Sequence, residues 1–170
     1  AVNAALTGHL VLSTLHTNNA AGVIPRLIDM GVQAFLLPSV LNLLAAQRLL
    51  SRLYERCRAP KDPPPEALEI IKNELGKMPR SVAERYKPPF KVFAAPGCRF
   101  CKGKGVSGRI ALFEAFEMTG ELAEIITHPP FTEETLLREA RRQGMISLRQ
   151  DGVAKAMDGL VSIEEVLKET

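Results

Sequence analysis

The chain of 170 residues contains no tryptophan, and aromatic residues make up only 5% of it. It also has no apolar run that approaches the ~20 residues of a membrane-spanning helix, which argues against a transmembrane protein. Residues 1–9 lack the charged start and the apolar stretch of a signal peptide. The remaining composition, 46% hydrophobic and 24% charged, is typical of a folded soluble domain and not of a disordered segment.

Cysteine is scarce, and the three cysteines are an odd number. An odd number argues against the paired disulfides of a secreted protein, so we expect a reducing, cytoplasmic environment. The net charge of +3 is small, and the lysines and arginines form no dense block, so charge alone gives little support for nucleic-acid binding. Because the first residue is Ala1 and not methionine, we expect the chain to be part of a longer protein.

Three segments dominate the N-terminal third of the chain. Residues 9–16, HLVLSTLH, form an apolar run between two histidines that is broken only by Ser13 and Thr14, which predicts a strand buried on both faces of a parallel sheet. Residues 20–30 predict a helix, in which Pro25 marks a kink or a late start. Residues 35–57 repeat leucine at helical spacing, which predicts one long amphipathic helix.

The remainder of the chain alternates short helices and strands with glycine- and proline-rich turns. The expected segments are a proline-rich linker at residues 59–65, a helix at residues 66–75, strands at residues 90–94 and 109–117, and a glycine-rich knuckle at residues 97–105. Helix-start signals at Thr132, Ser147 and Ser162 predict three further helices. The sequence therefore predicts an α/β protein with a helical C-terminal part.

Polar side chains follow the apolar run of residues 9–16 directly. If that run is a parallel strand, His16, Thr17 and Asn18 leave its carboxyl edge, where open α/β sheets bind ligands. An imidazole and a hydroxyl at this place can donate hydrogen bonds to phosphate oxygens or orient an attacking water. The alternative interpretation is a helix cap with two histidines, His9 and His16, that are satisfied within the fold.

Five segments, in this order, resemble the type II secretion and type IV pilus-assembly ATPases. They are ALTGHLVLSTLHTNNAA at residues 5–21, PRLIDMGV at 25–32, AAQRLLSRL at 45–53, GCRFCKGKGVSGRIALFEAF at 97–116, and ARRQGMISLRQDGVAKAMDGLVSIEEVL at 140–167. The first resembles the histidine box of that family, the fourth the second half of its cysteine module, and the last its C-terminal helical subdomain. The resemblance spans nearly the whole chain.

The resemblance implies an incomplete RecA-like P-loop ATPase domain that works in a hexameric ring. It divides the chain into residues 1–53 of the ATPase core, residues 54–108 as a cysteine module, and residues 109–170 as a return strand and helical subdomain. The implied function is that of a motor for type IV pilus assembly or type II secretion. Such a motor acts in the cytoplasm, at the inner membrane, on a platform protein, and is not expected to bind nucleic acid.

The resemblance also implies roles for single residues in the intact protein. His16, and His9 in the same box, would act at the γ-phosphate of ATP, while Thr14 and Thr17 would tune the end of the strand. Arg109 would lie near the nucleotide or at a subunit boundary, or else be an ordinary surface arginine. ATP and Mg²⁺ are the implied cofactors.

The phosphate-binding loop G-x-x-x-x-G-K-[ST] is absent from the sequence. In the family this loop and the acid that places Mg²⁺ lie upstream of the segment that matches Ala1. Phosphoryl transfer loses its main electrostatic supports without them, so we predict that the chain alone does not hydrolyse ATP. We also expect the loss of the upstream half to leave an exposed sheet edge, which favours self-association.

Cys98 and Cys101 form a C-x-x-C pair in the knuckle, which is half of a tetrahedral zinc site. The resemblance implies a second pair at positions 54 and 57, but only Cys57 is present and Tyr54, a poor zinc ligand, stands in the other position. Three interpretations stay open. The three cysteines and an unidentified fourth ligand bind zinc, the module is a packed remnant without metal, or the cysteines are plain buried thiols.

A small nucleic-acid-binding module is the alternative function from a different class. Arg99, Phe100, Lys102 and Lys104 lie in the knuckle, and a basic knuckle with an aromatic side chain can stack on a base and hold a phosphate. Against this interpretation, residues 9–16 would have no role. A third interpretation is an interaction domain with a decayed nucleotide site.

Overall fold

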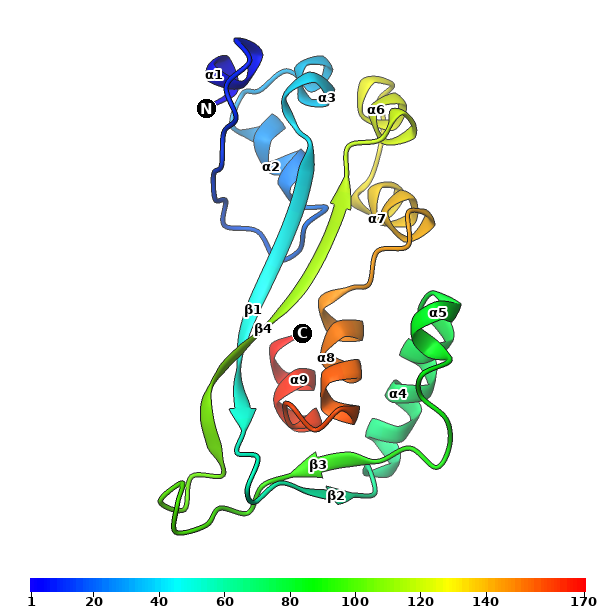
Figure 1. The fold of residues 1–170 in the computed structure, drawn as a ribbon. Helices are drawn as coiled ribbons and strands as arrows, with labels where there is room; N and C mark the ends of the chain where they lie inside the picture. Colours follow the sequence, from blue (N-terminus) through cyan, green and yellow to red (C-terminus); the bar gives the residue numbers. More distant parts are fainter. The chain divides into compact units, whose positions relative to one another are not determined.

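The computed structural model describes residues 1–170, and helices and short strands alternate along the chain (Figure 1). The helices are α1 (Val2–Leu6), α2 (Val23–Asp29), η1 (Ala34–Leu36, a 3₁₀ turn), α3 (Leu37–Val40), α4 (Pro65–Lys77), α5 (Arg80–Ala83), α6 (Gly120–Thr127), α7 (Glu133–Arg142), α8 (Leu148–Met157) and α9 (Ile163–Glu169). The strands are β1 (Leu43–Leu53), β2 (Ala59–Lys61), β3 (Val92–Ala94) and β4 (Val106–Glu117). The mixed α/β character expected from the sequence is confirmed.

The chain divides into two compact units, and each is built from two stretches of sequence. Unit 1 combines Ala1–Ala46 with Glu114–Met145, and unit 2 combines Gln47–Phe113 with Ile146–Thr170. Strands β1 and β4 pair with each other and run in opposite directions in Figure 1. The other sheet, β2 with β3, is antiparallel. The parallel strands expected from the sequence are therefore not present in this chain.

The segment predicted to be one long helix, residues 35–57, is mostly strand. Only η1 and α3 at its start are helical, and β1 follows them. Leu44 and Leu50 are buried, and their even spacing also fits a strand with one buried face. The leucine spacing satisfied both periods, and pairing with β4 decided between them because tertiary contacts override helix propensity.

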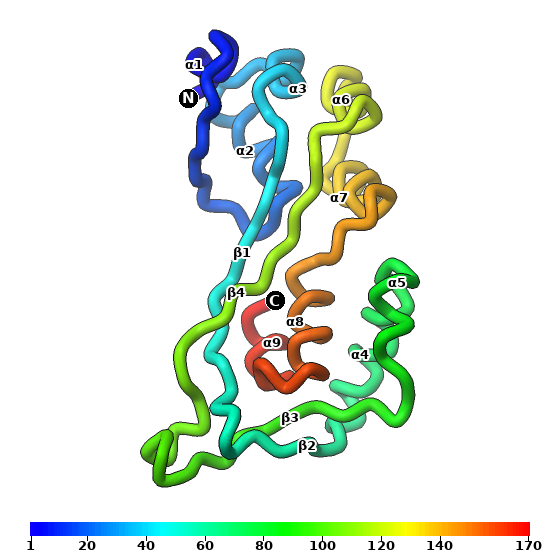
Figure 2. The backbone as a smooth tube through the Cα atoms, in the orientation of Figure 1, coloured from blue at the N-terminus to red at the C-terminus, as the bar shows by residue number.

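The prediction of a buried strand at residues 9–16 is wrong for this chain. The segment runs extended from α1 to α2 without belonging to a helix or strand (Figure 2). Leu10 is 85% exposed and Leu12 is 91% exposed. No backbone hydrogen bond joins residues 10–16 to the rest of the chain. A strand needs a neighbour that pairs its N–H and C=O groups, and neither sheet of the chain supplies one here.

The proline-rich segment at residues 59–65 is only partly a linker. Its first three residues form β2, in which Pro60 lies opposite Phe93 of β3. Proline is tolerated there because the strand lies at the edge of a two-stranded sheet. The helix predicted after it is confirmed as α4, which starts at Pro65, a position where the missing N–H of proline costs nothing.

The predicted helix starts are confirmed at their capping residues. Thr132 caps α7 by accepting the N–H of Thr135, and Ser147 forms a complete capping box with Gln150 in α8. Ser162 also caps α9. Glu165, three residues after Ser162, is the residue that would complete a capping box, but its carboxylate instead accepts the N–H of Ser51 at 2.8 Å.

The apolar core of each unit comes from helices packed on one another and on the strands. In unit 1 the buried side chains are Ala20, Ala21, Ile24, Leu37, Leu44, Phe116, Leu122, Ile126, Leu136, Ala140 and Met145. In unit 2 the fully buried side chains include Leu50, Ile71, Val92, Leu112, Val153, Val161 and Ile163. None of the helices is both long enough and apolar enough to cross a bilayer.

Helix side chains occupy the backbone groups of β4 that a further strand would use. In unit 1 the Gln143 amide accepts the Glu117 N–H at 3.0 Å and donates to the Glu117 carbonyl at 3.2 Å. In unit 2 the Asp151 carboxylate accepts the Phe113 N–H at 2.9 Å. These bonds occupy the backbone groups of Phe113 and Glu117, so those groups are not free to pair with a strand of another chain.

Gly152 lies inside α8, where even a methyl group has no room. A Cβ at this position would lie 2.5 Å from Val166 Cγ1 and 3.1 Å from Leu112 Cδ1. We expect the G152A substitution to lower the free energy of unfolding by about 1–3 kcal/mol, measured by urea denaturation. Gly76 near the end of α4 is the matched control, because nothing lies within 4 Å of its Cβ position and G76A should stabilise by up to about 1 kcal/mol. Equal stability of G152A and wild type would contradict this packing.

Candidate functional site

The part of the histidine box from His9 to Thr17, called the box from here on, has no buried residue and lies on the surface of unit 1. His16 and Thr14 are exposed, and Thr17 is half-buried. The Thr17 hydroxyl donates to the Asn19 carbonyl at 3.0 Å, which turns the chain toward α2. His9 lies at the other end of the segment, where its Nδ1 is 3.0 Å from the Thr7 hydroxyl. His16 and Thr17 are therefore neither inside a helix nor in the core, and their polar groups can reach a ligand.

The chain after the box is held at two points. Glu114 of β4 accepts the N–H of Ala20 at 2.7 Å. The Asn19 side chain accepts the N–H of Gly22 at 2.8 Å and donates to Glu133 of α7 at 2.6 Å. The turn between the box and α2 is thus fixed by carboxylates from two different elements.

A shallow hollow of about 240 Å³ lies beside this turn. It is lined by Thr17, Asn18, Asn19, Gly22, Pro25, Arg26, Asp29 and Glu133. Its walls combine hydroxyl, amide, guanidinium and carboxylate groups, which suits a polar ligand. Arg109 is not among the residues that line this hollow. It is exposed on β4, in unit 2.

The glycine-rich knuckle in unit 2 connects β3 to β4 and folds tightly on itself. Gly105 has φ of +68°, and a Cβ there would lie 2.2 Å from the Ala95 carbonyl oxygen, so only glycine fits. The Gly105 carbonyl accepts the N–H of Tyr54 at 2.9 Å. This bond joins the knuckle to the turn after β1, which carries Cys57.

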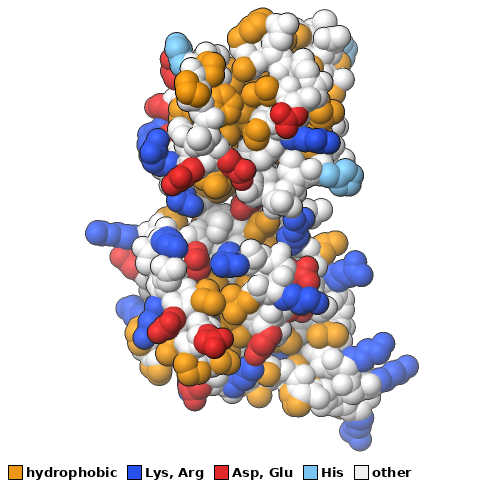
Figure 3. Space-filling model, turned by 180° about the vertical axis from the view of Figure 1, so that it is seen from behind, with side chains coloured by type: hydrophobic (Ala, Val, Ile, Leu, Met, Phe, Trp, Pro, Cys, Tyr) orange, Lys and Arg blue, Asp and Glu red, His pale blue; other side chains and the backbone are white.

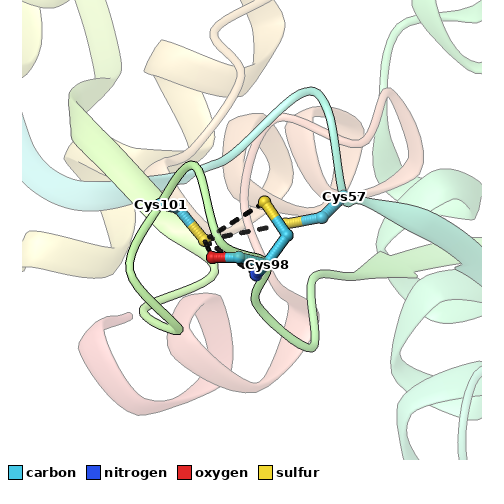
Figure 4. Close-up of side chains that lie close together, drawn as sticks. All are labelled: Cys57, Cys98 and Cys101. Carbon is cyan, nitrogen blue, oxygen red and sulfur yellow. Dashed lines mark hydrogen bonds between the residues drawn. The ribbon is translucent and has the colours of Figure 1, made fainter.

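The three cysteines come together at this junction (Figure 4). The Sγ atom of Cys101 lies 3.9 Å from that of Cys57 and 3.7 Å from that of Cys98, and all three lie within 4.8 Å of one another. Zinc–sulfur bonds of ~2.3 Å in a tetrahedron separate two sulfurs by about 3.8 Å. The two shorter separations match this value, so the residues fit a zinc ion with three thiolate ligands.

Backbone N–H groups point at the sulfur of Cys101. The N–H groups of Cys98 and Gly105 lie 3.1 Å and 3.2 Å from it. Burial by itself raises the pKa of the Cys101 thiol, but these N–H groups, together with hydrogen bonds from the thiols of Cys98 and Cys57, outweigh burial and bring the pKa down to about 7. Burial and the hydrogen bond to Cys101 raise the pKa of Cys57 to about 11. Of the three cysteines, Cys101 is therefore the one at which the surroundings favour the thiolate form that a metal requires.

Basic side chains surround an exposed aromatic ring on the knuckle. Phe100 is 56% exposed, and the guanidinium carbons of Arg99 and Arg56 lie 4.8 Å and 5.1 Å from its ring centre. Neither arginine, nor Lys102 or Lys104 beside them, forms an ion pair. In Figure 3, Lys and Arg side chains project together at the lower right with no Asp or Glu side chain among them.

Sequence reasoning missed Glu114 and Glu133, the two carboxylates that hold the turn after the box. The sequence around Glu114 could have indicated that this residue has a specific role. It lies between Leu112 and Phe116 at the spacing of one strand face, and a charged residue on an apolar face indicates a specific partner. Glu133 carried no such signal, because an acidic residue in the first turn of a helix is common.

Residues 1–168 match the family described as Type II/IV secretion system protein, and the chain belongs to this family. It is 41% identical over 169 residues to the Type IV pilus assembly ATPase PilB of Myxococcus xanthus, covering 99% of this chain and 28% of that protein. It is 40% identical over 170 residues to the Type II secretion system protein E of Pseudomonas aeruginosa, covering 100% of this chain and 31% of that protein. The chain therefore spans about three tenths of the length of these relatives.

Proposed function

We propose that this chain is the C-terminal part of a hexameric, RecA-like ATPase that powers type IV pilus assembly or type II secretion. One of the relatives given above is named a type IV pilus assembly ATPase and the other a type II secretion system protein, which supports this proposal. The chain supplies the histidine-box side of an ATP site, and the phosphate-binding loop comes from the part of the longer protein that precedes it. ATP with Mg²⁺ is the substrate of that site.

The exposed apolar segment at residues 9–16 carries this proposal. Side chains such as Leu10 and Leu12 are rarely left almost fully exposed in one run, and unpaired backbone groups beside them invite a neighbouring strand. A RecA-like sheet formed by the preceding part of the protein provides that neighbour. His16 and Thr17 would then leave the edge of the completed sheet where ligands bind.

The chemistry of the box follows from its groups. His16 donates to oxygens of the γ-phosphate or orients the attacking water, as preorganised donors do in phosphoryl transfer. The Thr17 hydroxyl gives its proton to the Asn19 carbonyl, so its oxygen can accept a hydrogen bond from that water. Thr14 and His9 support this edge of the sheet. Arg109 is exposed and charged, which suits a role at a neighbouring subunit of the ring.

The cysteine cluster holds a structural zinc ion in this proposal. Cys57, Cys98 and Cys101 supply three thiolates, and Tyr54 replaces the cysteine that would complete the set. The ion would pin the knuckle to the turn after β1. We place the protein in the cytoplasm at the inner membrane, where the module reaches the platform protein of the pilus or secretion machine.

The proposal is tested by ATP hydrolysis in two preparations. The longer protein that contains this chain should hydrolyse ATP in a magnesium-dependent manner, and the 170-residue chain should not, because it lacks the phosphate-binding loop. Light scattering of the longer protein should give the mass of six subunits. Hydrolysis by the isolated chain, or none by the longer protein, would contradict the proposal.

Nucleic-acid binding is the second candidate, and the exposed ring of Phe100 with two arginines close to it is the observation that favours it. Aromatic–base stacking and free cations are the features of single-strand binding surfaces. A titration of the chain with mixed single-stranded oligonucleotides at rising salt separates the two functions. The motor proposal expects no saturable binding, whereas the second candidate expects binding that weakens with salt and is lost in F100A.

A further inference from the structure

Glu114 is a carboxylate in the interior of the protein. It is 4% exposed and lies on β4 between the buried side chains of Leu112 and Phe116. A charged group at such a position costs free energy unless hydrogen bonds compensate for its lost hydration. An apolar residue of similar size would fill the same space at a lower cost, which points to a specific task for the carboxylate.

The hydrogen bond from the Ala20 N–H shows what the Glu114 carboxylate does. Glu114 accepts the N–H of Ala20 at 2.7 Å, and Ala20 itself is fully buried. Ala20 lies four residues after His16 and three after Thr17, at the first buried position that follows the exposed box. The bond therefore fixes the end of the box to a strand, while residues 10–16 make no backbone hydrogen bonds.

A charged acceptor makes this anchor strong. Hydrogen bonds from a backbone N–H to a carboxylate are shorter and roughly twice as strong as those between neutral groups. A catalytic group must be held within ~0.5 Å of its productive position by such supporting contacts. Without the bond, the turn between residue 16 and α2 would lose its link to β4, while the contacts of Asn19 with Gly22 and Glu133 would remain.

We propose that Glu114 is a positioning residue that sets the place of His16 and Thr17 relative to the nucleotide. This inference rests on the proposed ATPase function. Glu114 acts through the Ala20 N–H and touches no substrate, so its loss changes the rate of the chemical step more than the binding of ATP.

The test uses the longer, ATP-hydrolysing protein with Glu114→Met, which fills the space but accepts no hydrogen bond. We expect kcat to fall by about 10- to 100-fold with KM for ATP changed by less than about 3-fold, since small misplacements of a catalytic group have effects of this size. Glu114→Gln keeps an acceptor oxygen and should stay within about 3-fold of wild type. Glu165→Met is the matched control, because it removes a bond of the same kind, to the Ser51 N–H, in unit 2.

Two further measurements separate positioning from general stability. Hydrogen exchange at the Ala20 amide should become at least about 10-fold faster in E114M and remain unchanged in E165M. The double variant H16A/E114M should be no slower than H16A by more than about 3-fold, because both substitutions disable the same group. The proposal would be overturned if the losses of kcat in H16A and E114M multiplied in the double variant. It would also be overturned if E114M kept the kcat of wild type although its Ala20 amide exchanged faster.

The design also separates this inference from the proposed function. A wild-type protein without ATP hydrolysis defeats the motor proposal and the positioning role with it, while Ala20 exchange still reports whether the anchor exists. Normal hydrolysis in wild type and E114M alike defeats the positioning role only. If E114M does not fold, Glu114→Asp replaces it, because the shorter side chain withdraws the carboxylate from the Ala20 N–H and should give the same changes.

Discussion

Replacing His16 with alanine in the ATP-hydrolysing protein is expected to lower kcat by about 100-fold and to leave KM for ATP nearly unchanged. The loss of one preorganised donor to a developing negative charge costs about 10²- to 10³-fold in other enzymes. Because His16 is exposed, its substitution should change the free energy of unfolding by less than about 0.5 kcal/mol. Steady-state ATP hydrolysis and thermal unfolding of the same preparations measure both quantities.

The chain offers matched controls for this experiment among its three histidines. His128 is exposed at the end of α6 and bonds only within that helix and its end, so H128A should hydrolyse ATP like wild type. His9 contacts Thr7 and the Ala4 carbonyl, and H9A should lose less than about 10-fold. A loss in H128A as large as that in H16A would contradict the assignment of His16 to the site.

Adding the missing cysteine at position 54 is expected to convert a three-thiolate metal site into a four-thiolate site. Wild-type chain purified without chelator should contain one zinc per chain, and C101S should contain none, because Cys101 is the sulfur that contacts both others. In cobalt-substituted protein, the thiolate-to-metal absorption of Tyr54→Cys should exceed that of wild type by about one third, as three thiolates become four. Competition with a chelator should show tighter zinc binding.

The control for this variant is the other tyrosine of the chain. Tyr86 bonds to Asp158 and lies outside the cysteine cluster, so Y86C adds a cysteine without adding a ligand. Its cobalt spectrum and zinc affinity should equal those of wild type. Less than about 0.1 zinc per chain in wild-type protein with reduced thiols would contradict the proposed site, since a formed structural site binds zinc tightly.

Predictions from local chemistry agreed with the structure at the helix ends and at the turns. Thr132, Ser147 and Ser162 cap the helices where their hydroxyls predicted caps. The knuckle follows from its glycines, since a position such as Gly105 admits no other residue. These features depend on contacts between residues close in sequence, so the sequence was sufficient to find them.

Predictions that depended on distant partners were less successful. Residues 43–53 satisfied both a helical and an alternating pattern, and only pairing with β4 selected the strand. Residues 9–16 have the composition of a buried strand, but no strand of this chain lies beside them. The anchor from Glu114 to Ala20 joins residues 94 positions apart, and no local pattern predicts such a bond.

The sequence by itself determined the family, the caps, the tight turns and the identity of the three thiols. Local hydrogen bonding and backbone sterics act over a few residues and are therefore visible in the order of the side chains. Only the tertiary structure decided that Cys57 meets Cys98 and Cys101, and that Glu114 holds the turn after His16. Those arrangements arise because packing brings together segments that are distant along the chain. The geometry of that packing cannot be predicted from any one segment alone.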